Sequence, residues 1–198
     1  MVIIGHRGAA GLANENSLPA ITMALDNHVD MIELDVRVHN KQLVLSHEKT
    51  LKTEGYTTLQ DALHTVNGVI PINLEIKELS VVSRLSKALQ HYEGEILFSS
   101  FEFQILQELK KQFPSYPLAV LERWSGIRAV AVAAYLGTDR LHINQKWLWG
   151  GFVRSIKQQN YSLYAYTVNN IERATELAEW GVDGIFTDRP DMFKNHTL

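Results

Sequence analysis

Short runs of β-forming residues alternate with segments of helical periodicity along almost the whole chain. The runs lie at residues 2–5, 31–38, 72–76, 96–99, 118–121, 140–143, 162–167 and 184–187, about 25 residues apart, the usual length of a βα repeat. Helical patterns fill the intervals, at residues 18–27, 59–66, 80–91, 102–112, 127–135, 146–159 and 171–180. No linker or low-complexity tract divides them. Eight such units predict one α/β domain over residues 1–198, a compact TIM (β/α)8 barrel.

Two local patterns refine this prediction. A doubly wound open sheet, the alternative architecture, normally carries a G-x-G-x-x-G loop after its first strand, whereas Gly5-His6-Arg7-Gly8 stands there. Residues 43–46 form one further β-type run, joined to the strand at 31–38 by the polar turn 39–42. We expect this extra hairpin strand to bring His47 back over the mouth of the barrel.

Composition excludes several classes of function. The 198 residues include 19 Lys plus Arg against 22 Asp plus Glu, so the chain lacks the basic excess of a nucleic-acid or anionic-membrane binder. There is no cysteine, which excludes disulfides and a thiol nucleophile and leaves His, Asp and Glu as the metal ligands. No apolar run is long enough for stable membrane insertion, and no signal peptide opens the chain, so a cytoplasmic location is expected.

Acidic residues interrupt two neighbouring strands that should be apolar. In the strand at 31–38 the odd positions Glu33, Asp35 and Arg37 share one face, and Glu75 and Lys77 do the same in the strand at 72–76. The other face suits packing on helices, so we expect the charged face to point into the barrel near its C-terminal rim. Three converging carboxylates favour a hard divalent cation such as Mg²⁺, Ca²⁺ or Mn²⁺. Neutralisation of the acids by Arg37 and Lys77, without a metal, is the alternative.

Two histidines are expected at the same rim. His6 ends the first strand and His47 follows the hairpin strand. A pair of histidines can take and give a proton in one displacement reaction at neutral pH. Arg7 and Lys77 add fixed positive charge, which suits an anionic substrate such as a phosphate ester.

These residues occur in motifs that resemble those of the glycerophosphodiester phosphodiesterase family. The family's H-R-G, P-E-N-T, I-E-x-D-V and H-D motifs correspond to His6-Arg7-Gly8, Asn14-Glu15-Asn16-Ser17, Ile32-Glu33-Leu34-Asp35-Val36 and His47-Glu48. Its L-E-I-K, W-T-V-N and G-V-D-G-I-I-T-D-x-P motifs correspond to residues 74–77, 166–169 and 181–190. The order and spacing of these motifs make the resemblance specific, and it spans nearly the whole chain.

The resemblance implies a TIM-barrel phosphoric diester hydrolase that uses one divalent cation, Mg²⁺ or Ca²⁺, to split glycerophosphodiesters into sn-glycerol 3-phosphate and an alcohol. It implies three roles for the residues above: metal ligands, an acid/base pair, and substrate or phosphate contacts. The metal ligands would be Glu33, Asp35 and Glu75, and the acid/base pair His6 and His47. The substrate or phosphate contacts would be Arg7, Lys77 and Tyr166.

Three departures from the family pattern leave the proposed ligands in place: Asn14 replaces Pro, Glu48 replaces Asp, and Tyr166 replaces Trp. The insertion that many members carry after the second strand is nearly absent, since residues 48–58 alone connect His47 to the next helix. With little to cap the mouth, we expect weak selectivity for the alcohol head group.

Two other functions stay open from the sequence. One is a phospholipase similar to sphingomyelinase D, and the other is a catalytically silent module that binds glycerophosphodiesters. The expected partner is a small-molecule phosphodiester substrate, whereas the sphingomyelinase D-like enzyme would act on lipids. The chain can be a monomer or a homodimer, since the almost wholly apolar helix at 127–135 suits either burial in the outer ring or a dimer contact.

Overall fold

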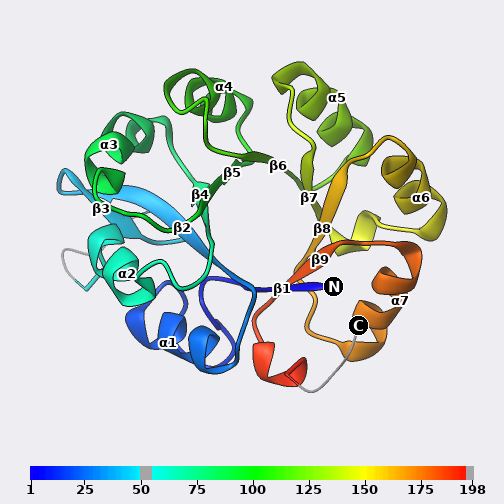
Figure 1. Cartoon of the computed structure of the whole chain (residues 1–198), viewed down its shortest axis with the longest axis horizontal. Coiled ribbons are helices and arrows are strands. Elements are labelled where there is room, and N and C mark those ends of the chain that lie inside the picture. The colour runs from blue at the N-terminus through cyan, green and yellow to red at the C-terminus, as the bar shows by residue number, and fades with distance from the viewer. Residues whose placement is uncertain (50–54, 195–198) are drawn as a thin grey trace.

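A computed structural model describes residues 1–49 and 55–194. In these ranges eight parallel strands form a closed ring, and helices surround it (Figure 1). The strands of the ring are β1 (Val2–Gly5), β2 (Met31–His39), β4 (Ile72–Ile76), β5 (Ile96–Ser100), β6 (Leu118–Glu122), β7 (Arg140–Asn144), β8 (Ser162–Tyr166) and β9 (Gly184–Thr187). The predicted TIM barrel is therefore confirmed, with strand ends within one residue of the expected ones.

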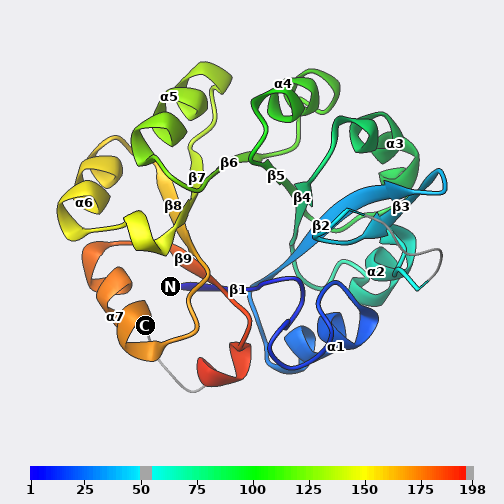
Figure 2. The same ribbon diagram turned by 180° about the vertical axis from the view of Figure 1, so that it is seen from behind.

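The first and last strands close the ring. β1 pairs in parallel with β9, Gly5 opposite Thr187, and with β2 on its other side, Gly5 opposite Ile32. The expected hairpin is also present, because β3 (Gln42–Leu45) pairs antiparallel with the end of β2. Figure 2 shows from behind that this hairpin extends outward beyond the ring. Part of the short connection at 48–58 lies outside the described residues.

Seven α-helices lie outside the ring in the described part of the chain. They are α1 (Leu18–Asp26), α2 (Leu59–Val66), α3 (Leu79–Leu89), α4 (Phe103–Gln112), α5 (Gly126–Leu136), α6 (Gly150–Gln158) and α7 (Ile171–Trp180). Side chains of Ser17, Thr58 and Asn170 cap three of them by accepting backbone N–H groups of the first turn. The strand residues that point outward, such as Leu34 and Leu74, are fully buried between ring and helices.

The segment at 146–159 differs from the single helix expected there. It begins with a 3₁₀ turn (Gln145–Trp147), passes through two extended residues, and continues as α6. The break buries Leu148 while Trp149 stays exposed. Arg173 of α7 stabilises it by donating to the carbonyl oxygens of Gln145 and Leu148 at 2.7 and 3.0 Å.

Only one side of α5 packs against the ring. Ala129, Ala133 and Leu136 are buried, whereas Ile127 and Tyr135 are exposed. Burial against the ring thus explains the apolar residues on that side of the helix, and leaves Ile127 and Tyr135 unexplained. None of the described helices is both long and apolar enough to cross a membrane.

Candidate active site

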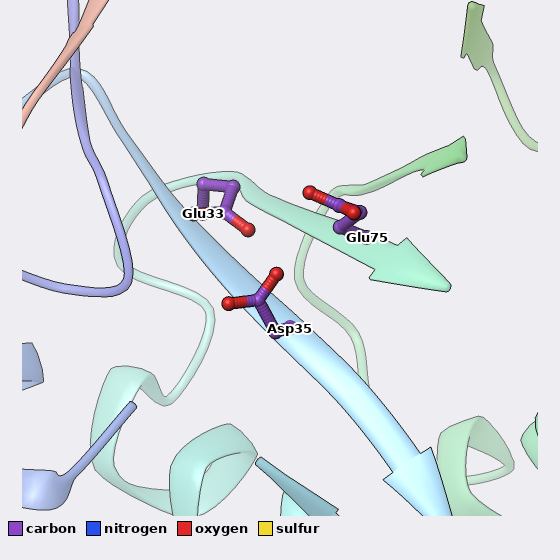
Figure 3. Close-up of side chains that lie close together, drawn as sticks. All are labelled: Glu33, Asp35 and Glu75. Atoms are coloured by element: carbon purple, nitrogen blue, oxygen red, sulfur yellow. The ribbon is translucent and has the colours of Figure 1, made fainter. Parts of the chain in front are cut away.

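Three carboxylates converge inside the C-terminal rim of the barrel. Glu33 and Asp35 come from β2 and Glu75 from β4, where Asp35 and Glu75 are direct partners in the strand register. Each offers an oxygen, and these oxygens lie within 4.8 Å of one another. Figure 3 shows the side chains directed toward a common point between the two strands. All three are buried, so the parallel register of two strands alone is enough to build this cluster.

Basic groups neutralise the cluster only in part. The ammonium of Lys77 lies 2.8 Å from Asp35 Oδ1 and also pairs with Glu75, and Arg7 Nε lies 3.2 Å from Asp35 Oδ2. Arg37, which the metal-free alternative also requires, does not reach the acids: it pairs with Glu78 at 3.8 Å and donates to the carbonyl oxygen of His47. That half of the alternative is wrong, and Glu33 has no Lys or Arg side-chain partner among the described residues.

The environment separates the pKa values of these acids. Burial, with repulsion from Asp35 and Glu75, raises the pKa of Glu33 well above its usual value. Burial also acts to raise the pKa of Asp35, but the charges of Lys77 and Arg7 outweigh it and lower the pKa. Glu33 Oε1 is buried with no hydrogen-bond partner in the described ranges. An unsatisfied carboxylate oxygen in an all-oxygen cluster fits a hard divalent cation such as Mg²⁺ or Ca²⁺.

His6 is held by a hydrogen-bonded pair of side chains from the other end of the chain. Its Nδ1 lies 2.6 Å from Asp188 Oδ1, and Asn169 Nδ2 donates to Asp188 Oδ2 at 2.6 Å. The backbone N–H of His6 donates to the carbonyl oxygen of Thr187 at 2.9 Å. Nε2 of the ring faces the acids, 4.0 Å from Glu33. His6 is thereby oriented with one nitrogen bound and the other toward the cluster.

His47 has a similar arrangement at the end of the β3 hairpin. Its Nδ1 lies 2.8 Å from Glu48 Oε1, and the guanidinium of Arg37 holds its carbonyl oxygen. Burial, aided by the positive charges of Lys77 and Arg7, lowers the pKa of His47. A depressed pKa keeps the imidazole neutral at pH 7, so this residue can accept a proton.

The turn after β1 depends on unusual backbone angles. Arg7 and Gly8 adopt φ of 52° and 84°, the left-handed region that favours glycine. A Cβ on Gly8 would lie 2.6 Å from a backbone carbon of Ala20, so only glycine fits. The turn lets the Arg7 backbone N–H donate to Glu33 at 2.8 Å. Asn16 secures the same region by donating to the Asp35 carboxylate at 2.8 Å and accepting its backbone N–H at 3.0 Å.

A pocket of about 370 Å³ opens over the cluster. Of the eight residues assigned from the sequence, all but Asp35 line it; Asp35 is 1% exposed and lies beneath. Tyr166 contributes its ring, since its hydroxyl donates to the Glu122 carbonyl oxygen at 2.7 Å and is not free for a substrate. Phe101, Arg123 and Trp124 also line the pocket. The structure thus brings the sequence-predicted residues to one site.

Sequence reasoning assigned no role to Asn16 and Asp188, which contact Asp35 and His6, or to Asn169, which contacts Asp188. Each belongs to one of the family-like motifs, which was the available signal. Their contacts with Asp35 and His6 join positions 19 and 182 residues apart, and such distances are visible only after the ring closes.

A comparison with family models matches this chain to the glycerophosphoryl diester phosphodiesterase family over residues 6–67 and 46–192. The chain belongs to this family. Family membership confirms the resemblance inferred from the motifs, and it places the chain among the phosphoric diester hydrolases.

Relatives of known name match the chain over nearly its full length. The glycerophosphodiester phosphodiesterase of Caldanaerobacter subterraneus subsp. tengcongensis is 26% identical, covering 98% of this chain and 96% of the relative. That alignment runs over 234 positions against 198 residues here, so the relative carries residues that this chain lacks.

Solved structures show the same fold. An Oleispira antarctica phosphodiesterase, in complex with the product sn-glycerol-3-phosphate, superposes with a TM-score of 0.91 at 23% identity, covering 98% of this chain and 95% of that one. The glycerophosphodiester phosphodiesterase of Thermotoga maritima gives 0.83 at 23% identity, with 98% and 96% covered.

Proposed function

We propose that this protein hydrolyses glycerophosphodiesters to sn-glycerol 3-phosphate and an alcohol, with one divalent cation and a histidine pair. The observation that carries the proposal is the common pocket: a buried triad of carboxylates, two histidines and two basic side chains all meet in it or directly beneath it. The named activity of the relatives and the product bound to the Oleispira enzyme support the same substrate class.

In this proposal Glu33, Asp35 and Glu75 hold the cation, Mg²⁺ or Ca²⁺. A bound cation would polarise the phosphoryl oxygens and offset the charge that builds up in the transition state. Lys77 and Arg7, which already lie beside the acids, would also donate hydrogen bonds to the phosphate oxygens. The ring of Tyr166 would pack against the glycerol portion.

The two histidines would move the protons. One imidazole takes the proton of the glycerol 2-hydroxyl as that oxygen attacks phosphorus, and the other gives a proton to the alcohol oxygen as its bond to phosphorus breaks. Water then opens the cyclic phosphate with the proton transfers reversed. Each transfer would supply about 10²–10⁴-fold. In both residues Nδ1 has a carboxylate partner, which leaves Nε2 for the proton transfer.

The direct test measures sn-glycerol 3-phosphate released from glycerophosphocholine, with Mg²⁺ or Ca²⁺ and with a chelator. We expect turnover that the chelator abolishes, and loss of at least about 100-fold in Glu33→Gln. Glu108→Gln, a half-buried acid of α4 that does not line the pocket, is the matched control. Cation binding followed by calorimetry provides a readout besides activity, and should weaken in Glu33→Gln alone.

Other outcomes would assign other functions. Binding of glycerophosphocholine without turnover would indicate the silent module, and turnover indifferent to chelator would contradict the cation. Release of a free head group from sphingomyelin, with none from glycerophosphocholine, would indicate the sphingomyelinase D-like reaction. A panel of head groups tests the expected weak selectivity, which a strong preference for one alcohol would contradict.

A further inference from the structure

The rim of the barrel beside the pocket carries a strip of exposed apolar side chains. Trp124 follows β6 and is 72% exposed, and Ile127 in the first turn of α5 is 80% exposed. Trp147 and Trp149, between β7 and α6, are 48% and 61% exposed. β6 and β7 are neighbours in the ring, and α5 and α6 lie next to each other outside it (Figure 1). We call these four side chains the rim strip.

Contacts along the rim link the loop before α5 to the start of α6. Gly126 packs so closely on Phe152 that a Cβ there would lie 1.9 Å from the ring. The ring of Phe152 in turn lies 6.2 Å from that of Trp149. Since Gly126 stands between Trp124 and Ile127 in the chain, the apolar surface runs from α5 to the start of α6. Its inner end is the pocket, because Trp124 is also a wall residue there.

The strip is presented rigidly. Glu122 accepts the backbone N–H groups of Arg123 and Trp124 at 2.8 and 2.9 Å, and it pairs with Arg128 at 2.5 Å. Tyr166 donates to the Glu122 carbonyl oxygen. These bonds hold the loop that exposes Trp124, so its exposure is built into the fold.

Basic side chains border the strip. Residues 122–158 contain six Lys or Arg; of these, Arg140 starts β7 at the other end of the ring, while Lys157 pairs with Asp183 and Arg128 with Glu122. Arg123, Lys146 and Arg154 are exposed. Arg123 lies over the Phe101 ring in the pocket wall, and Arg154 reaches the start of α6 at Gly150. Glu122, the acid directly before Arg123, is buried and already paired, and the exposed Glu102 lies on the β5 side of Arg123.

We propose that the rim strip docks the mouth of the barrel on an anionic phospholipid surface. Tryptophan favours the boundary between lipid and water, because its ring is apolar and its N–H needs a polar partner. Bordering Lys and Arg side chains attract anionic head groups and extend beside them. A second copy of the chain fits less well, since a symmetric contact would bring Arg123, Lys146 and Arg154 against the same groups.

The charge of the whole chain gave no reason to expect this. It averages over all faces, whereas the exposed Arg123, Lys146 and Arg154 are carried by the segment that runs from the end of β6 into α6. Docking of this kind is peripheral, with side chains rather than a helix entering the head-group layer. It does not depend on turnover, so it can be measured on its own.

The test is co-sedimentation of the full chain with vesicles of phosphatidylcholine, with and without phosphatidylglycerol, at low and high salt. We expect binding to the anionic vesicles with a blue shift of tryptophan emission, weakened by salt. The double variant Ile127→Ser/Trp149→Ser should weaken binding at least about ten-fold. Val69→Ser, 67% exposed before β4 at the opposite end of the barrel, should bind as the parent does.

Hydrolysis of water-soluble glycerophosphocholine by the double variant should stay within about two-fold of the parent, because neither residue lines the pocket. That result separates a failure of docking from a failure of the proposed function. Absence of binding to anionic vesicles at low salt would overturn the proposal, as would equal binding by the double variant. A concentration-dependent dimer, seen by light scattering and lost in that variant, would assign the strip to a second copy instead.

Discussion

Asp188 controls which nitrogen of His6 carries the proton. Asn169 Oδ1 accepts the hydroxyl of Thr187 at 3.0 Å and the backbone N–H of Asp188 at 2.9 Å. Its amide nitrogen must therefore face Asp188, to which it donates at 2.6 Å. The remaining oxygen of Asp188 is left to accept from His6 Nδ1 at 2.6 Å. The proton of neutral His6 is thus on Nδ1, and Nε2 is free to accept one from the substrate.

Asp188→Asn should reverse this order. Asn169 still donates, so the new amide must turn its oxygen to Asn169 and its NH₂ to His6. Nδ1 would then accept, and Nε2 would carry the proton. Loss of a hydrogen bond to a charged partner costs about 1.5–3 kcal/mol, or about ten- to a hundred-fold. The wrong tautomer of an Asp–His pair costs up to about 10⁴-fold in kcat. We expect a loss between these limits.

The second substitution Asn169→Asp should restore activity in this background. A carboxylate at 169 accepts from Thr187, from the backbone at 188 and from the new amide, whose oxygen then faces His6 again. The assay is kcat/KM for glycerophosphocholine across pH, with unfolding measured beside it. Asp191→Asn, which weakens the surface ion pair with Arg189 and leaves the His6 contacts in place, is the control. A loss below about three-fold in Asp188→Asn, or no recovery in the double variant, would refute the reasoning.

Two further predictions concern stability. Burial lowers the pKa of His142 to about 3, and neither ring nitrogen has a hydrogen-bond partner in the described ranges. In the unfolded chain the His142 imidazole takes up a proton near pH 6.5, whereas in the folded protein it stays neutral until about pH 3. The stability that the neutral buried ring contributes is therefore complete above pH 6.5 and is lost as the pH falls toward 3. Between pH 7 and pH 5 the free energy of unfolding of the parent should fall by about 2 kcal/mol more than that of His142→Leu. Urea unfolding at the two pH values measures this, and an equal fall in both proteins would contradict it. Gly8→Ala combines a φ of 84° with a clash against the backbone of Ala20, and should destabilise by about 2–4 kcal/mol. Gly137→Ala, with φ of 64° and nothing within 4 Å, should cost about 1 kcal/mol; equal shifts in thermal unfolding would show that the clash is relieved.

The barrel could be predicted because each strand–helix unit is recognisable from neighbouring residues in the sequence. Each strand can be located from its own run of β-forming residues. The alternation of polar and apolar residues then predicts that Glu33, Asp35 and Glu75 point into the barrel. The histidines were found for the same reason, since each follows a strand directly. These signals require no knowledge of distant contacts.

The features that sequence reasoning missed depend on long-range contacts. The helix expected at 146–159 is interrupted where Arg173, from the following helix, donates to the carbonyl oxygens of Gln145 and Leu148. The helical periodicity of residues 146–159 cannot predict a contact with a residue outside the segment. Arg37 shares a face with the acids by alternation, yet its length and the nearby His47 carbonyl oxygen direct it away from them. The alternation of residues along a strand predicts which face a side chain lies on, but it does not predict which group that side chain will contact.

Closure of the ring through β1 and β9 has a consequence for synthesis. The ribosome adds His6 182 residues before Asp188. Until Asp188 is made, the growing polypeptide therefore holds an imidazole whose hydrogen-bond acceptor does not yet exist. A product truncated before Asp188 can fold in part but cannot orient His6 as the proposed chemistry needs, so we expect it to have no activity.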